Sequence, residues 1–106
     1  LGDALRAMVR LRHRHLLVVD DAGRCIGVLV DRAIAAAWAK DPASLSARPV
    51  RSALRTPPAM VGTRAKVLDV SRLMRAGGVD AVVVADEDGR PVGIVTSTDL
   101  VALLAR

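Results

Sequence analysis

An internal repeat constrains this chain more than any other feature. When the sequence is shifted by 66 residues, residues 1–40 align with residues 67–106 without a gap, and ten of the 40 positions are identical. Many of the other aligned pairs exchange one apolar residue for another. A repeat of this kind folds as one supersecondary unit used twice, so both blocks are predicted to follow the same chain path. The identical pairs include Asp3/Asp69, Arg6/Arg72, Met8/Met74, Asp20/Asp86, Gly23/Gly89, Arg24/Arg90 and Gly27/Gly93.

Each block predicts a helix, two strands and a closing helix. Apolar residues recur at helical spacing at the start of both blocks, and Gly77-Gly78 ends the helix of the second. Two short apolar runs separated by a polar turn with glycine are typical of a hairpin. The strands are expected over Leu16–Val19 and Cys25–Val30, then over Ala81–Ala85 and Pro91–Thr96. The closing helices are expected over Asp31–Ala39 and Thr98–Ala105.

The stretch between the blocks is rich in proline and predicts a linker. A single helical turn is expected over Val50–Leu54, and a short strand over Ala59–Val61 leads into the helix of the second block. The corresponding strand of the first block is not present before Leu1. We therefore expect a truncated first repeat at 1–40, a linker at 41–57 and a second repeat at 58–106. The predicted fold is α/β, in which two β-α-β-β-α repeats pack with pseudo-twofold symmetry into one module and bury each other's open sheet faces.

The composition narrows the class of protein. Hydrophobic residues make up 52% of the chain and charged residues 25%, which favours a packed core over disorder. No apolar run approaches the length of a membrane span, and no signal peptide is visible. The single cysteine, Cys25, excludes an intramolecular disulfide and favours a cytoplasmic, reducing setting. We expect Cys25 to be a small buried or edge residue and Trp38 to pack in the core or at a dimer interface.

The charge is unevenly spread. The net charge is +5, and residues 1–66 hold 12 basic and 5 acidic side chains. This balance favours anionic ligands, or it is a solubilising surface. Single-strand nucleic-acid binding is disfavoured, because the chain has one Trp and no Tyr or Phe to stack on bases.

The second block resembles a CBS domain, the family named after cystathionine β-synthase. The resemblance rests on the strand Val79–Asp86, on Gly89 and on the segment Gly93–Leu100, and the internal repeat extends it to nearly the whole chain. It implies a tandem CBS pair, which is a regulatory module and not an enzyme. Pairs of this family bind adenine nucleotides or S-adenosyl compounds in clefts between the repeats, and they commonly form homodimers.

Gly93–Asp99 matches the family's ligand-binding motif. A strand ends at Thr96 and a helix begins within two residues, so unpaired backbone N–H groups there favour phosphate. Thr96, Ser97 and Thr98 add hydroxyl groups, and Asp99 offers acceptors for ribose hydroxyls. The same residues also suit a simple helix cap, and the two roles can coexist.

The resemblance implies that Thr96 and Asp99 face the start of the middle strand of the first repeat. His13, Arg14 and His15 occupy that position, and arginine and imidazole are suitable partners for phosphate. The alternative is a solvated turn between helix and strand. A metal site is disfavoured, because His13 and His15 have no firm third ligand nearby.

The related cleft of the pair is expected to be degenerate. In the aligned segment, Val30 replaces the threonine and Ala33 replaces the aspartate, so both polar anchors are lost. We expect this cleft to be empty or to bind without the usual ribose contact. The residues expected to face it are Met60, Val79, Asp80 and Ala81.

The sequence therefore predicts a regulatory module that binds an adenine nucleotide (AMP, ADP or ATP) or an S-adenosyl compound, with no required cofactor. Two alternatives stay open: a ligand-free dimerisation or structural module, and weak nucleic-acid binding through the Arg-rich first half. An enzyme is disfavoured, since no nucleophile–base pair or Walker-type phosphate loop is found. The resemblance also implies a homodimer and an enzyme or transporter domain elsewhere in a longer parent chain.

Overall fold

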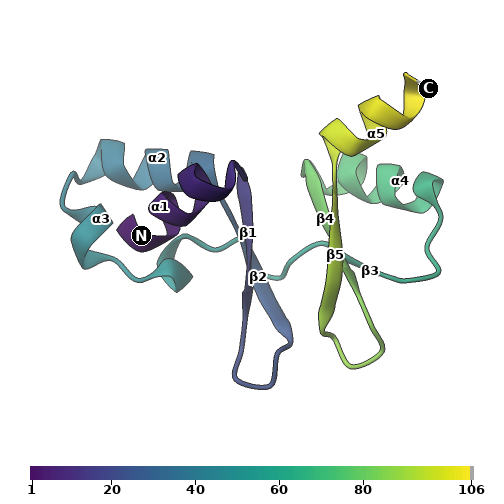
Figure 1. Ribbon diagram of the computed structural model, residues 1–106, viewed down its shortest axis with the longest axis horizontal. Helices are drawn as coiled ribbons and strands as arrows, with labels where there is room; N and C mark the ends of the chain where they lie inside the picture. The colour runs from purple at the N-terminus through teal and green to yellow at the C-terminus, as the bar shows by residue number, and fades with distance from the viewer. Residues whose placement is uncertain (106) are drawn as a thin grey trace. The chain divides into compact units, whose positions relative to one another are not determined.

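A computed structural model describes residues 1–105 as two compact units (Figure 1). Unit 1 contains residues 1–18 and 26–57. Unit 2 contains residues 19–25 and the chain from Pro58 onward. The tip of the first hairpin therefore groups with the second repeat. The predicted α/β class is confirmed.

Unit 1 is built from helices around one apolar cluster. Its elements are α1 (Gly2–Leu11), β1 (His15–Val19), β2 (Cys25–Val30), α2 (Asp31–Lys40), α3 (Ser44–Ala47) and the 3₁₀ turn η1 (Val50–Ala53). Val19 and Cys25, at the hairpin ends of β1 and β2, belong to unit 2. Strands β1 and β2 pair as a two-stranded sheet, and α3 packs against α1 and α2 (Figure 1). The buried cluster consists of Leu1, Met8, Leu29, Ile34 and Ala37. The predicted helical turn at η1 is confirmed, whereas α3 was not predicted.

Unit 2 carries the full β-α-β-β-α order that the second block predicts. Its elements are β3 (Met60–Gly62), α4 (Val67–Gly77), β4 (Ala81–Ala85), β5 (Pro91–Thr96) and α5 (Ser97–Leu104). The sheet order is β3-β4-β5, with β3 parallel and β5 antiparallel to β4 (Figure 1). The central strand is the most buried, and Val82 packs on Val70 and Met74 of α4.

The hairpin turns of the two repeats have the same geometry. In each, the first aspartate (Asp20 or Asp86) accepts hydrogen bonds through Oδ1 from the amides two and four residues later, at 2.9 and 3.0 Å. Gly23 and Gly89 take left-handed φ angles of 82° and 80°, which glycine adopts without steric cost. The backbone amide of Arg24 is the main cause that holds the pKa of Asp20 below its usual value.

The first helix of each repeat also ends in the same way. Arg12 and Gly78 occupy equivalent positions and take left-handed φ angles of 57° and 60°. The next amide then bonds back to the helix, from His13 to Met8 at 3.0 Å and from Val79 to Met74 at 3.1 Å. Arginine has a Cβ atom that penalises this conformation, so the first repeat keeps the motif at a cost in free energy.

Two residues depart from the predicted burial. Trp38 is 53% exposed, so a core role for this side chain is wrong; a role at a dimer interface stays a prediction. The inner face of α2 is formed instead by Ile34 and Ala37. Strand β1 is only half-buried, with Val19 exposed, although its apolar run suggested full burial. Cys25 is 8% exposed, which confirms that it is a small buried residue.

Helix starts differ between the repeats in their side-chain caps. At α5, Thr96 and Asp99 form a capping box. At α4, Asp69 Oδ2 accepts from Lys66 N at 3.0 Å, which is half of such a box because a lysine side chain has no acceptor. At α2, the N-cap is Val30 and makes no side-chain hydrogen bond.

We predict that Arg12→Gly stabilises the chain by about 0.5–1 kcal/mol. The substitution removes a left-handed penalty of about 1–2 kcal/mol, and the greater freedom of glycine in the unfolded chain offsets part of this gain. Urea unfolding measures the difference. Gly78→Ala is the matched control and should destabilise by a similar amount; equal stability of all three proteins would contradict this account.

We also predict that Val30→Thr with Ala33→Asp installs the missing cap of α2. The double variant should gain about 1 kcal/mol in the free energy of unfolding, since an N-cap box contributes about 0.5–2 kcal/mol. Thermal and urea unfolding both report it. Ala36→Asp adds the same charge in the helix interior and should not stabilise. A double variant no more stable than the parent chain would contradict the prediction.

Candidate functional site

The start of α5 holds the four polar residues predicted to bind a ligand. Strand β5 ends at Thr96, whose extended backbone turns the chain into the helix at Ser97. Ser97, Thr98 and Asp99 are exposed, and Thr96 is half-buried. These side chains therefore lie on the first turn of α5 within reach of solvent.

Thr96 and Asp99 are bonded to each other. Asp99 Oδ2 accepts from Thr96 N at 2.8 Å and from Thr96 Oγ1 at 3.0 Å, while Asp99 N donates to Thr96 Oγ1 at 3.3 Å. The predicted cap by Thr96 is thus confirmed. Because the hydroxyl has only one proton to donate, Thr96 is not the open donor that the sequence suggested. Asp99 Oδ1 takes no part in the box.

The backbone amides of this first turn are also largely occupied. Ser97 N donates to Asp80 O at 2.9 Å, and Asp99 N donates to Thr96 Oγ1. Among residues 1–105, this leaves Thr98 N as the first-turn amide without a partner. The expectation of several unpaired N–H groups for phosphate is therefore wrong in number, because the carbonyl of Asp80, just before β4, and the hydroxyl of Thr96 each accept from one of them.

Asp80 is a contact of this helix start that sequence reasoning placed elsewhere. Val79, Asp80 and Ala81 were assigned to the degenerate cleft, together with Met60. Within unit 2, the carbonyl of Asp80 bonds to the first amide of α5, and the assignment of these four residues to the degenerate cleft stays a prediction. Arg14 and Asp31 make the same bond 66 residues earlier, but no side chain signals it in either repeat, because only main-chain atoms take part.

The start of α2 shares this backbone geometry but not the side chains. Asp31 N donates to Arg14 O at 3.0 Å, as Ser97 N does to Asp80 O. Val30 and Ala33 have no polar side-chain atom, so no counterpart of the Thr96–Asp99 box exists there. The start of α2 therefore lacks both polar groups that Thr96 and Asp99 provide at the start of α5, as the sequence predicts. Whether this site is empty stays a prediction.

The basic segment predicted to meet the ligand lies in unit 1. His13 and Arg14 are exposed, and His15 is the half-buried first residue of β1. Arg14 Nε donates to Asp31 Oδ2 at 3.3 Å. Arg14 is 77% exposed, so this ion pair adds little stability and can exchange for another anion. The predicted facing of this segment and Thr96–Asp99 stays a prediction.

Metal-binding clusters and membrane-spanning helices are both absent from the described part of the chain. Among residues 1–105, no group of three or more His, Cys, Asp or Glu side chains is placed to hold a metal ion. Over the same residues, none of the helices has the length and hydrophobicity that crossing a membrane requires.

Comparison with known proteins identifies the family. The family model for the CBS domain matches residues 1–40 and 50–106. An uncharacterised 33.4 kDa protein in a ribosomal RNA operon of Thermofilum pendens is 32% identical over 116 residues, an alignment that covers 97% of this chain. The chain spans 39% of the length of that curated relative.

Solved structures agree on the fold. The CBS domain pair of protein MJ0100, in complex with 5′-methylthioadenosine and S-adenosyl-L-methionine, has a TM-score of 0.87 and 25% identity, covering 97% of this chain and 79% of that one. CBSX2 in complex with AMP has a TM-score of 0.82 and 25% identity, covering 99% and 81%. CBS domain pairs are regulatory modules. The chain belongs to the CBS domain family and carries a tandem pair of CBS domains.

Proposed function

We propose that this CBS pair is a regulatory module that binds one adenine nucleotide or S-adenosyl compound per chain at the start of α5. The exposed Thr96–Asp99 turn, intact in the second repeat and lost in the first, carries the proposal. Support also comes from the similar CBS pairs bound to S-adenosyl-L-methionine with 5′-methylthioadenosine and to AMP.

Asp99 is the residue proposed to select the ribose. Its Oδ2 atom is held by the cap, so the carboxylate is fixed in orientation. Its Oδ1 atom is left to accept from a ribose hydroxyl, and a hydrogen bond to a charged acceptor is among the stronger ones. The cap therefore preorganises the ribose contact instead of competing with it.

Phosphate binding needs more than the first turn of α5 supplies. Thr98 N and the hydroxyls of Ser97 and Thr98 are the donors there, and none of them is charged. In the proposal, His13, Arg14 and His15 supply the cationic groups, with Arg14 exchanging Asp31 for the ligand's phosphate. A ligand with one phosphate, or with none, makes the smallest demand on these donors.

The stoichiometry follows from the difference between the repeats. The start of α2 lacks a hydroxyl at Val30 and a carboxylate at Ala33, so it offers no ribose acceptor. We therefore propose one occupied site per chain and an empty or atypical second one. The same proposal includes the repeat boundaries given above, a homodimer, and an enzyme or transporter domain that the module regulates. It also includes the absence of catalysis by the module and a cytoplasmic location.

A ligand-free dimerisation module is the second candidate. Apolar side chains on α5 favour it, because Val101 is 65% exposed and Leu104 is 84% exposed. Exposed apolar groups on one helix are typical of a surface that another chain covers. Nucleic-acid binding through the Arg-rich segments has weaker support and predicts a steep salt dependence.

Calorimetric titration of the chain with AMP, ADP, ATP and S-adenosylmethionine tests the proposal. We expect saturable binding near one ligand per chain, and Asp99→Ala should weaken it by about 1–3 kcal/mol, the loss expected for a hydrogen bond to a charged group. No binding of any of the four by the folded chain would favour the dimerisation module.

The control separates ligand binding from helix capping. Asp69→Ala removes a comparable carboxylate cap from α4 of the same unit, so it should cost a similar amount of stability without changing affinity. Asp99→Asn keeps an acceptor for Thr96 N but loses the charge, and it should also bind more weakly. Equal losses of affinity in Asp69→Ala and Asp99→Ala would contradict a ribose contact by Asp99.

A further inference from the structure

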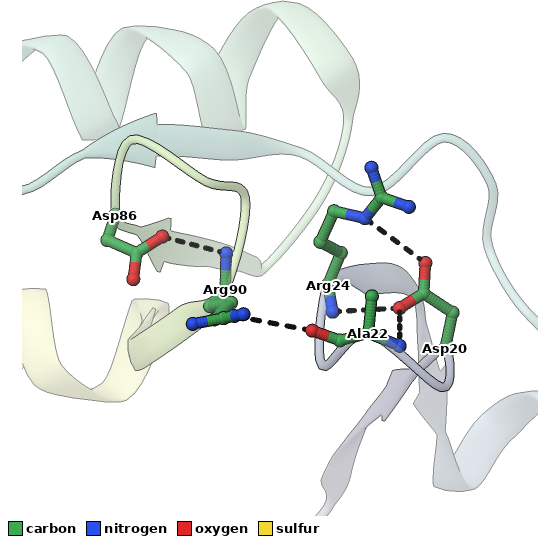
Figure 2. A network of polar contacts seen from close by, with 5 residues as sticks. All are labelled: Asp20, Ala22, Arg24, Asp86 and Arg90. Carbon is green, nitrogen blue, oxygen red and sulfur yellow. Dashed lines mark hydrogen bonds and ion pairs between the residues drawn. The ribbon is translucent and has the colours of Figure 1, made fainter.

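The tips of the two hairpins form a contact within unit 2 that the proposed function does not use. Cys25 N donates to Gly89 O at 3.0 Å, and Arg90 Nε donates to Ala22 O at 3.3 Å. Figure 2 shows the guanidinium of Arg90 pointing at the carbonyl of Ala22. We call this contact the turn clasp, made by Ala22, Gly23, Cys25, Gly89 and Arg90.

Packing at the turn clasp is reciprocal. A Cβ atom at Gly23 would lie 3.8 Å from Arg90 Nε, and one at Gly89 would lie 3.6 Å from Arg24 Cγ. Each glycine thus faces the arginine of the other turn, and the arginine stems cover the turn backbones. The two turns are internally rigid because aspartate side chains bridge their amides (Figure 2).

The side-chain hydrogen bond of the turn clasp has little protection from water. This bond from Arg90 is exposed to solvent, and Arg24 pairs with Asp20 of its own turn at 3.4 Å and not across the clasp. The seven residues of the hairpin tip, 19–25, belong to unit 2, whereas the residues before and after them belong to unit 1. The chain therefore crosses from one unit to the other twice within this hairpin. Segments with few buried contacts open at a lower free energy than the core.

We propose that the turn clasp is a local switch: it opens and closes while both sheets stay folded, and opening exposes the thiol of Cys25. Cys25 is buried and begins β2 next to the clasp hydrogen bond. It is the single cysteine of the chain, so a thiol reagent reports on this position alone. The proposal is independent of ligand binding, because it concerns the unliganded chain.

The test measures the rate at which Ellman's reagent modifies Cys25 in urea concentrations below the unfolding transition. We expect a rate well below that of the unfolded chain and nearly independent of urea, as for a local opening that exposes little surface. A rate with the urea dependence of global unfolding would overturn the proposal. So would a rate equal to that of the unfolded chain.

Substitution of Arg90 provides the second arm. Arg90→Ala removes one hydrogen bond of the turn clasp and should speed modification about two- to tenfold, the range for the loss of one such bond. Arg75→Ala removes the same charge from α4 of the same unit and should leave the rate unchanged. If Arg90→Ala fails to fold, Arg90→Lys, which retains the charge but displaces the donor, should still react faster. An unchanged rate in the folded Arg90 variant would overturn the proposal.

Discussion

One backbone hydrogen bond organises each repeat. The first amide of the closing helix donates to the carbonyl of the residue just before the hairpin's first strand, from Ser97 to Asp80 at 2.9 Å and from Asp31 to Arg14 at 3.0 Å. It joins the end of one strand to the beginning of the other and sets where the helix begins. Because only main-chain atoms take part, the same junction forms over different side chains. The repeats can therefore share a fold and differ in chemistry.

That difference is concentrated at the helix start. In the second repeat, Thr96 and Asp99 cap α5 and leave one carboxylate oxygen outside the cap. In the first repeat, Val30 and Ala33 make no such contacts. The cap and the proposed ribose contact use different oxygens of one carboxylate, so helix stability and ligand binding need not compete. This arrangement links the local structure of the turn to the proposed function.

Much of the fold could be predicted because the repeat supplies each pattern twice. The bounds expected for β2, β4 and β5 match the structure. Helix α3 was missed because its four residues, Ser44–Ala47, are too few to show a helical period. Trp38 was expected in the core or at a dimer interface; its side chain is exposed, like that of Leu104 at the aligned position, so the core role is wrong.

The site was only partly predictable for a related reason. Side-chain types identified Thr96 and Asp99, but residue identity does not reveal that Asp80 O occupies an amide of the first turn. Backbone partners are set by the junction between strand and helix, which becomes visible only in three dimensions. The predicted donor set was accordingly larger than the one the structure leaves open.

The most direct test of the account is an amide chemical-shift titration of the ¹⁵N-labelled chain with AMP. The account predicts saturable shifts for the amides of Thr98 and Asp99 that are larger than those of the aligned amides of Arg32 and Ala33, which sense only the exchange of Arg14 away from Asp31. Shifts at Arg32 and Ala33 of equal size, or saturation without any change at Thr98 and Asp99, would contradict the claim that the start of α5 is the working site.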